Sequence, residues 1–401
     1  MLSFEVALSR LLAGAPPPVE VCSLQTLAAA GRVLAEAQVA PIDAPPLDNS
    51  AMDGYAVAVD DIGSVPTRLP VTQRIPAGSV GTRLQAGTAA RVFTGAPIPE
   101  GADAVVMQEL CEHLPGEVLI KHLPTVGEHI RRAGSDIAAD SEILAAGQRL
   151  RPQDTALAAS VGIASLPVFR RLRVAVFFTG DELRMPGEAL QAGAIYNANR
   201  FLLGALLERL GCEVHDHGQV PDDLAATRQA LRAAALDCDL VLTSGGVSVG
   251  EEDHVKAAVQ AEGRLEMWKI AIKPGKPLAF GQIVDGERQL PFIGLPGNPV
   301  SSFVTFLMLV RPFLLRMQGV RRVAPLTYLL RADDEWSRPD ARREFLRARL
   351  NAEGGVQFFA NQGSGVLTSA VWGDGLIDNP PQQAIRRGET VRFLPFSELL
   401  T

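Results

Sequence analysis

The chain has 401 residues, 47% of them hydrophobic and 21% charged, with a net charge of 38 − 45 = −7. This composition predicts a globular protein of two to four domains and argues against a general binder of nucleic acid or of anionic membranes, which need a basic surface. The longest apolar run, 303–310, is about half the length of a membrane span. The four cysteines are scattered along the chain and no two of them form a C-x-x-C motif. We therefore expect a protein of the reducing cytoplasm.

The first 168 residues predict two domains, one inserted into the other. An apolar stripe from Phe4 to Leu12 predicts a helix, and a second helical stripe begins at Leu24. Residues 141–168 return to a helical pattern, so 1–40 and 141–168 are assigned to one helical linker domain. Between them, residues 41–140 carry short β-type runs separated by Gly and Pro, which predicts a β-rich insertion domain.

Residues 169–322 alternate strand and helix. This alternation predicts a doubly wound α/β domain, in which helices cover both faces of a parallel sheet. Residues 323–401 are β-rich again and form a separate C-terminal domain. The expected fold class is therefore α/β and multidomain.

Three strands of the α/β domain end in loops of small residues. The loop residues of interest are Thr179, Gly180, Ser244, Gly245, Gly246, Ser248, Pro296, Gly297, Asn298 and Pro299. In a doubly wound sheet, ligands bind at the carboxyl ends of the strands, where loop amides and helix N-termini face anions. One such loop is more often a turn than a site, but three on one rim indicate a phosphorylated or otherwise anionic ligand.

Carboxylates occur beside the same loops. Glu182 lies in the first loop, and Asp253 follows the second. A single acid there could serve only the helix dipole, for about 0.3–1 kcal/mol. Several acids beside phosphate-type loops indicate Mg²⁺ instead, since this ion takes one or two carboxylates and completes its shell with phosphate oxygens and water.

Lysine is concentrated at one place. Of the 38 basic residues 33 are Arg, yet three of the five lysines, Lys269, Lys273 and Lys276, fall within eight residues. This indicates a need for a compact ammonium group. We expect Lys269 and Lys273 to share a face of one strand, with a solvated sheet edge as the alternative.

One motif in this region is misleading. The segment 246–250 matches the G-x-S-x-G elbow of α/β hydrolases. Their triad places an acid and then a His after the Ser, but only His254 follows Ser248 and no acid element fits between them. A serine hydrolase is therefore excluded.

The insertion domain has polar segments of its own. Asp53 precedes an expected strand, Thr94 follows another, and Arg131 and Arg132 stand shortly before Asp136. Taken alone, each of these segments predicts no more than a turn.

Together these segments resemble the molybdopterin molybdenumtransferase family, which includes MoeA and the E-domain of gephyrin. The matching stretches keep the family's order over most of the chain. They are Asp48–Val57, Arg91–Glu109, Ile130–Ile137, Thr179–Leu183, Leu242–Asp253, Lys269–Phe280 and Gly294–Ser302.

The resemblance implies an enzyme that inserts molybdenum from molybdate into adenylylated molybdopterin, with magnesium-dependent release of AMP. It implies that the C-terminal domain is a β-barrel. It also implies an elongated homodimer, in which the insertion domain of one subunit faces the α/β domain of the other. A molybdopterin adenylyltransferase is the expected partner that delivers the adenylylated substrate.

The family's site positions carry over onto particular residues of this sequence. The implied catalytic residues are Asp53, Thr94, Asp136, Glu182, Asp253, Lys269 and Lys273. Of these, Glu182, Asp253 and Asp53 would hold or orient magnesium, and the two lysines would neutralise phosphate or molybdate. The implied substrate-binding residues are Arg131, Arg132, Thr179, Gly180, Asp222, Ser244, Gly245, Gly246, Ser248, Lys276, Pro296, Gly297, Asn298, Pro299 and Ser364.

Two other functions fit the same fold. A non-catalytic molybdopterin carrier or scaffold would have no need of Asp53 or Lys273, so the intact set of acids and lysines argues against it. A general nucleotide pyrophosphatase would act on plain dinucleotides and would be indifferent to molybdate.

Overall fold

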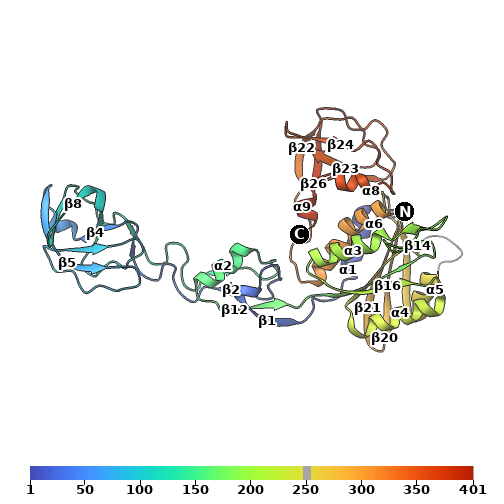
Figure 1. The fold of residues 1–401 in the computed structure, drawn as a ribbon, viewed down its shortest axis with the longest axis horizontal. Coiled ribbons are helices and arrows are strands. Elements are labelled where there is room, and N and C mark those ends of the chain that lie inside the picture. Colours follow the sequence, from blue (N-terminus) through green and yellow to red (C-terminus); the bar gives the residue numbers. More distant parts are fainter. Residues whose placement is uncertain (247–253, 401) are drawn as a thin grey trace.

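The computed structural model describes residues 1–246 and 254–400. The molecule is elongated, with the insertion domain at one end, a linker in the middle, and the α/β unit and the C-terminal unit together at the other end (Figure 1). The predicted site residues Ser248 and Asp253 lie outside the described residues.

The α/β unit is built around a six-stranded sheet. In order across the sheet, its strands are β16 (Glu213–Val220), β13 (Arg173–Thr179), β17 (Leu240–Ser244), β21 (Arg288–Leu295), β20 (Pro277–Asp285) and β18 (Gly263–Lys269). The first four are parallel, whereas β20 and β18 run antiparallel to their neighbours. The expected doubly wound α/β fold is confirmed. The prediction that its sheet is parallel was wrong for β20 and β18, because the short Gly286-Glu287 loop makes β20 and β21 a hairpin.

Helices cover both faces of this sheet. They are α1 (Phe4–Ala13), α3 (Ala198–Arg209), α4 (Leu224–Asp237), α5 (His254–Glu262), α6 (Pro299–Thr305) and α7 (Arg311–Met317), and the two-stranded pair β14 (Leu183–Arg184) and β15 (Ile195–Tyr196) lies beside the sheet. Strand β13 contributes alternate residues to two cores. Val176 and Phe178 pack with α1, α3, α6 and α7, and Phe177 packs with α4 and α5. Both faces of the strand are therefore buried.

The most apolar helical run is part of this core. Helix α6, the π-helical segment 306–310 and α7 form one continuous run, Pro299–Met317. It is long and apolar enough to cross a membrane, but 94% of its most apolar window is buried inside the protein.

The C-terminal unit is a closed five-stranded barrel. The strands are β22 (Tyr328–Ala332), β23 (Arg343–Leu350), β24 (Gly355–Phe358), β25 (Gly375–Asn379) and β26 (Thr390–Pro395), and the short helices are α8 (Leu367–Trp372) and α9 (Phe396–Leu399). Strand β23 pairs with both β24 and β25, which closes the ring. The short strand β19 (Ile272–Lys273) pairs with β23, so the lysine-rich segment of the α/β unit is tied to the barrel.

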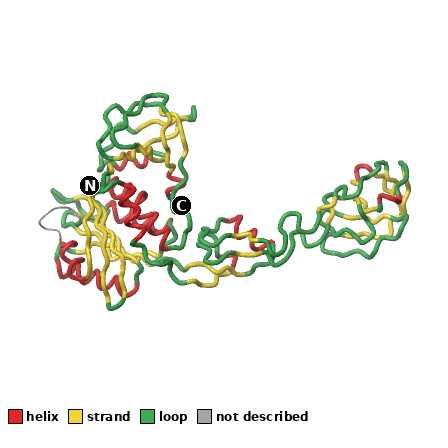
Figure 2. Tube along the Cα trace, turned by 180° about the vertical axis from the view of Figure 1, so that it is seen from behind, coloured by secondary structure: helices red, strands yellow, loops and turns green. Residues whose placement is uncertain are grey.

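The linker contains more strand and loop than predicted (Figure 2). Its elements are β1 (Val21–Gln25), β2 (Gln38–Val39), β11 (Glu142–Leu144), α2 (Pro152–Ser160) and β12 (Ser165–Phe169). The predicted second helix around Leu24 was wrong. These residues form β1, which pairs with β12, and Leu27, expected on the apolar stripe, is 98% exposed.

The prediction that the first helix belongs to the linker domain was also wrong. Phe4, Ala7 and Leu11 of α1 are buried in the core of the α/β unit and not in the linker. The ring of Phe4 packs edge-on against Phe345 of the barrel, at 5.5 Å between centroids. An amphipathic stripe predicts a buried face but does not identify its neighbour.

The insertion domain is a six-stranded sheet with a core on each face. In order, the strands are β7 (Ala104–Met107), β4 (Gly54–Val57), β6 (Ala89–Val92), β5 (Thr67–Ile75), β9 (Glu117–Ile120) and β8 (Cys111–Leu114), and a further pair joins β3 (Asn49–Ser50) to β10 (Ile130–Arg131). Val57 and Val106 lie in one core, and Ala56 and Val105 in the other.

A buried carboxylate anchors the linker to the α/β unit. Arg170, directly after β12, donates to both oxygens of Asp239 at 2.6 and 2.8 Å, and the backbone N–H of Arg173 donates to the same carboxylate at 2.8 Å. Burial by itself would raise the pKa of Asp239, but these donors keep that pKa below its ordinary value.

We predict that Asp239→Asn lowers the free energy of unfolding by about 3 kcal/mol, because it removes the buried charge partner of Arg170 and leaves only the exposed Glu20. The pKa of Asp239 is lowered by folding, so the stabilisation is present above the unfolded pKa, near 4, and is lost as the pH falls through the folded value. Urea unfolding at pH 7 and pH 3 measures both effects. The exposed neighbour Asp237→Asn is the control, and an equal effect of the two variants at pH 7 would contradict the anchor.

Candidate functional site

A cavity of about 610 Å³ lies where the α/β unit meets the barrel. It sits at the carboxyl ends of β13, β17 and β21, the edge at which doubly wound sheets bind ligands. The predicted residues that line it are Thr179, Gly180, Glu182, Asp222, Gly245, Gly246, Lys273, Lys276, Pro296, Gly297, Asn298 and Ser364. The structure thus brings together all three predicted loops.

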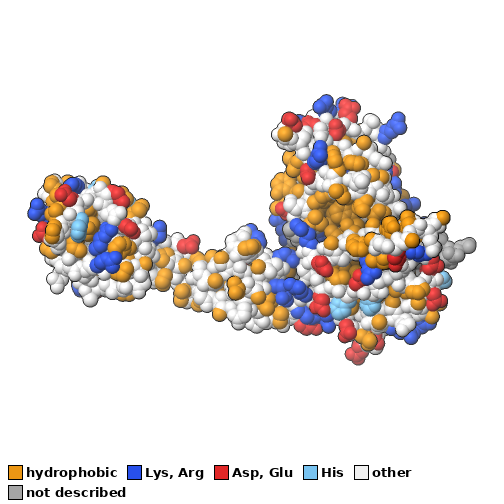
Figure 3. Space-filling model, in the orientation of Figure 1, with side chains coloured by type: hydrophobic (Ala, Val, Ile, Leu, Met, Phe, Trp, Pro, Cys, Tyr) orange, Lys and Arg blue, Asp and Glu red, His pale blue; other side chains and the backbone are white. Residues whose placement is uncertain are grey.

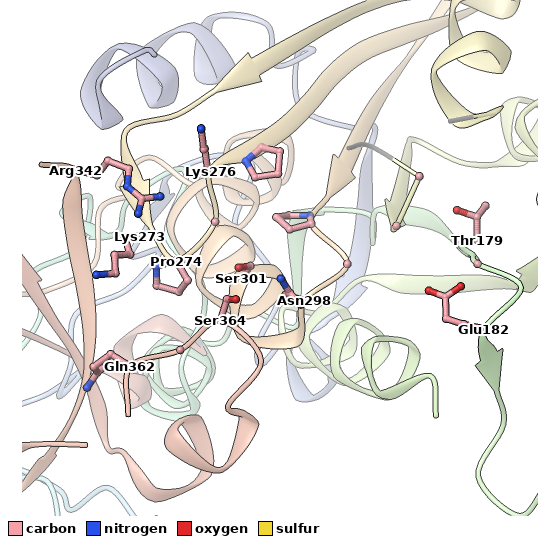
Figure 4. A pocket seen from close by; sticks show the side chains of 18 of the residues that line it. Thr179, Glu182, Lys273, Pro274, Lys276, Asn298, Ser301, Arg342, Gln362 and Ser364 are labelled. Atoms are coloured by element: carbon pink, nitrogen blue, oxygen red, sulfur yellow. The ribbon is translucent and has the colours of Figure 1, made fainter. Parts of the chain in front are cut away.

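Charges of opposite sign lie on opposite sides of this cavity (Figure 4). Lys273, Lys276 and Arg342 lie on one side, and Glu182 lies on the other with Thr179. Asn298, Ser301 and Ser364 lie between the two groups. Such a cavity suits an elongated anion that meets cations at one end and a carboxylate-bound metal at the other.

The backbone geometry of the loops explains why some of their residues are small. Gly245 has φ +98°, and a Cβ there would come within 2.7 Å of the Thr179 carbonyl oxygen. Ser244 is buried, donates to the Pro296 carbonyl oxygen at 3.0 Å and accepts from Asn199 at 2.8 Å. Ser244 therefore joins two of the loops without lining the cavity, and Pro299, in the first turn of α6, does not line it either.

The two lysines expected on one strand face are separated. Strand β18 ends at Lys269, and Lys273 belongs to β19, which turns away to pair with the barrel. Lys273 lines the site cavity, whereas Lys269 lines a neighbouring cavity that shares Lys276 with it. The shared face was a wrong prediction, because the chain changes partner strand between the two residues.

Two carboxylates of the barrel hold Lys273. Its Nζ lies 3.2 Å from Oε1 of Glu344 and 3.4 Å from Oδ2 of Asp340. Glu344 is fully buried and also accepts from Nε1 of Trp336 at 2.8 Å. Hydrogen bonds from Arg342 hold the pKa of Asp340 well below its ordinary value. In the described ranges no carboxylate forms an ion pair with Lys276, so its charge faces the cavity uncompensated.

The barrel also positions the loop that carries Ser364. The buried Arg347 exchanges backbone hydrogen bonds with the side chain of Gln362 at 2.9 and 3.0 Å, and burial lowers the pKa of its guanidinium to about 10. The N–H of Val300 in α6 donates to the carbonyl oxygen of Ser364 at 3.0 Å. The lining residues that were not predicted from the sequence include Ser301, Arg342 and Gln362. The last two belong to the barrel, which the β19–β23 pairing brings to the cavity.

The predicted residues of the insertion domain form a separate group. The backbone N–H and the hydroxyl of Thr94 both donate to Oδ1 of Asp53 at 2.8 Å, which lowers the pKa of Asp53. Arg132 pairs with Asp48 at 2.6 Å, and Arg131 and Asp136 are exposed nearby. In one chain this whole domain lies at the far end of the molecule from the cavity (Figure 1).

The carboxylates available for a metal at the cavity are few. Among residues 1–246 and 254–400, no group of three or more His, Cys, Asp or Glu side chains is placed to hold a metal ion. Glu182 and Asp222 line the cavity, whereas the next residue, Asp223, caps α4 through a 2.8 Å bond from the N–H of Ala226. Two carboxylates fit a hydrated Mg²⁺ that takes its remaining ligands from water and phosphate.

Comparison with protein families matches the chain in three consecutive parts. Residues 2–162 match the MoeA N-terminal region (domain I and II), residues 175–316 a probable molybdopterin binding domain, and residues 330–396 the MoeA C-terminal region (domain IV). The chain belongs to the molybdopterin molybdenumtransferase (MoeA) family. The expected role of the chain, a transferase of molybdenum cofactor biosynthesis that inserts molybdenum, is thereby confirmed.

The relatives with known names are similar to this chain over most or all of its length. The molybdopterin molybdenumtransferase of Haemophilus influenzae is 40% identical over 407 aligned positions, which cover 100% of both chains. Molybdopterin molybdenumtransferase 2 of Mycobacterium tuberculosis is 40% identical over 88% of this chain and 89% of its own. A crystal structure of a MoeA molybdopterin biosynthesis protein from Pyrococcus horikoshii superposes with a TM-score of 0.86 at 30% identity, over 98% of this chain and 100% of the other.

We predict that Lys273 and Glu344 are energetically coupled. Lys273→Met and Glu344→Gln should each destabilise the protein, and the double variant should lose less than the sum by about 1–3 kcal/mol, since each single variant removes a charge partner from the other group. Unfolding free energies of the wild type, the two single variants and the double variant give this coupling. The exposed barrel residue Glu335→Gln combined with Lys273→Met is the matched control. If the effects of Lys273→Met and Glu344→Gln add to within about 0.5 kcal/mol in the double variant, the two residues are not coupled and the prediction is contradicted.

Proposed function

We propose that this chain inserts molybdenum from molybdate into adenylylated molybdopterin and releases AMP, with Mg²⁺ as the metal cofactor. The observation that carries the proposal is the cavity with Lys273, Lys276 and Arg342 on one side and the carboxylate of Glu182 on the other. A substrate with a phosphate link and a metal oxyanion as co-substrate requires both kinds of group in one site.

The cationic side is suited to bind the molybdate oxyanion. Lys273 is held in place by two carboxylates, which leaves it oriented but largely neutralised. Lys276 supplies uncompensated charge, and the hydroxyls of Ser301 and Ser364 can donate to oxyanion oxygens. Preorganised donors of this kind stabilise developing negative charge without reorganising during the reaction.

The carboxylate side is suited to hold magnesium. Glu182 and Asp222 would be its protein ligands, and Asp253 remains a predicted ligand. A bound magnesium ion neutralises phosphate charge and lowers the pKa of a coordinated water. The amides of the Gly245-Gly246 and Gly297-Asn298 turns would orient the phosphate link beside it.

The proposed active unit is a homodimer. Asp53, Thr94, Asp136, Arg131 and Arg132 cannot reach the cavity of their own chain, so their role requires the insertion domain of a partner subunit. Apolar side chains gather on the surface between the barrel and the helices below it (Figure 3), and Phe201 of α3 and Val371 of α8 are 55% and 82% exposed. Exposed apolar surface of this extent is typical of a protein interface.

The proposed setting is the cytoplasm, with a molybdopterin adenylyltransferase as the supplier of the adenylylated substrate. All four cysteines are free thiols, as expected in a reducing compartment. A non-catalytic carrier of the same fold is the second candidate, and the AMP assay that follows separates the two.

The test is AMP release from adenylylated molybdopterin and magnesium, with and without molybdate. We expect release only when molybdate is present, and a loss of about a hundredfold in Asp53→Ala, as for removal of a group that orients the reacting groups. Asp60→Ala, an exposed acid of the same domain, is the matched control. Release that is indifferent to molybdate would support a pyrophosphatase, and binding without release would support a carrier.

A further inference from the structure

A second cavity lies on the sheet of the insertion domain, close to the Asp53–Thr94 pair and, within one chain, far from the cavity of the α/β unit. Its volume is about 550 Å³, and it is lined by residues of β4, β5, β6 and β8, with Phe93 directly after β6 and Gln108 directly after β7. The buried Tyr55 lines it together with Arg74, Arg91 and Phe93. A cavity of this size accommodates a small organic ligand.

Two guanidinium groups share one aromatic ring in this cavity. Arg74 and Arg91 are register partners on the parallel strands β5 and β6. Their Cζ atoms lie 4.7 and 5.0 Å from the ring centre of Phe93, and Arg91 also lies 5.0 Å from the ring of Tyr55. Cation–π contact stabilises each cation separately, but the two like charges repel each other.

In the part of the chain that the structure describes, no carboxylate pairs directly with either arginine, and the electrostatic partner of Arg91 is Asp53, whose pKa Arg91 helps to lower. Within the described ranges, neither Arg74 nor Arg91 forms an ion pair with a carboxylate, and Arg74 makes no hydrogen bond. Arg91 is fixed by its donations to the carbonyl oxygen of Gly54 at 3.2 Å and to Oε1 of Gln108 at 2.5 Å. The cavity therefore presents one oriented guanidinium beside one whose donors are open.

We propose that this cavity binds a phosphate monoester, with Arg74 and Arg91 as its anion-binding residues. Arginine offers paired donors that match phosphate oxygens, and an anion between the two guanidinium groups removes their mutual repulsion. The volume leaves room for an organic group attached to the phosphate, and the apolar side chains of Val71 and Phe93 supply a surface for it. This inference does not depend on the proposed reaction at the other cavity.

The test is photolabelling of the full-length protein with 8-azido-AMP, followed by mapping of the labelled peptides. We expect label within residues 55–113, reduced at least tenfold in Arg74→Gln and in Arg91→Gln. Arg83→Gln is the matched control, because Arg83 is an exposed arginine of the same domain that pairs with Glu100 at 3.1 Å. AMP or inorganic phosphate should compete with the label, and adenosine should not.

Three results would overturn the proposal. They are label confined to peptides outside the insertion domain, label unchanged by Arg74→Gln, and competition by adenosine as strong as by AMP. Arg74 is exposed, so its variant tests the site even if Arg91→Gln fails to fold. Loss of AMP release in the assay for the proposed function would leave this labelling unaffected, so the two failures are distinguishable.

Discussion

The course of the β1–β12 ribbon is the constraint on which the function of this molecule depends. The two strands pair along five residues each and carry the linker away from the α/β unit. The ion pairs of Asp239 with Arg170 fix the end of the ribbon where it enters the sheet. With this connection paired and anchored, the insertion domain lies at the far end of the molecule from the cavity of its own chain. Under the proposed function, the acids of that domain would therefore act at the cavity of a partner subunit.

The cavity itself depends on contact between two units of the chain. The loops at the ends of β13, β17 and β21 provide one wall, and the barrel provides Arg342, Gln362 and Ser364. The β19–β23 pairing and the Lys273–Glu344 contact join the two walls. The buried carboxylate therefore serves the site indirectly, since it fixes the position of a lysine that lines the cavity.

The sequence predicted the parts of the site that follow from local rules. Loops of small residues after parallel strands must meet at one edge of the sheet, and Thr179, Gly246 and Asn298 indeed line one cavity. Arg342 could not be found in this way, because it reaches the cavity through strand pairing between residues distant in the chain. The same limit explains why α1 was placed with the linker and why Lys269 was placed beside Lys273. In both cases the local pattern was compatible with more than one neighbour. The roles of Ser248 and Asp253 stay predictions.

The most direct test of a site shared between subunits is complementation between two inactive variants. Asp53→Ala and Lys273→Ala chains, mixed and allowed to exchange subunits, would form mixed dimers as half of the total, each with one intact site of two. The account predicts recovery of about a quarter of the wild-type AMP release. A mixture of Asp53→Ala with Asp136→Ala should recover nothing, because both changes lie on the same domain. If the mixture of Asp53→Ala and Lys273→Ala chains exchanges subunits and stays inactive, a site shared between subunits is contradicted.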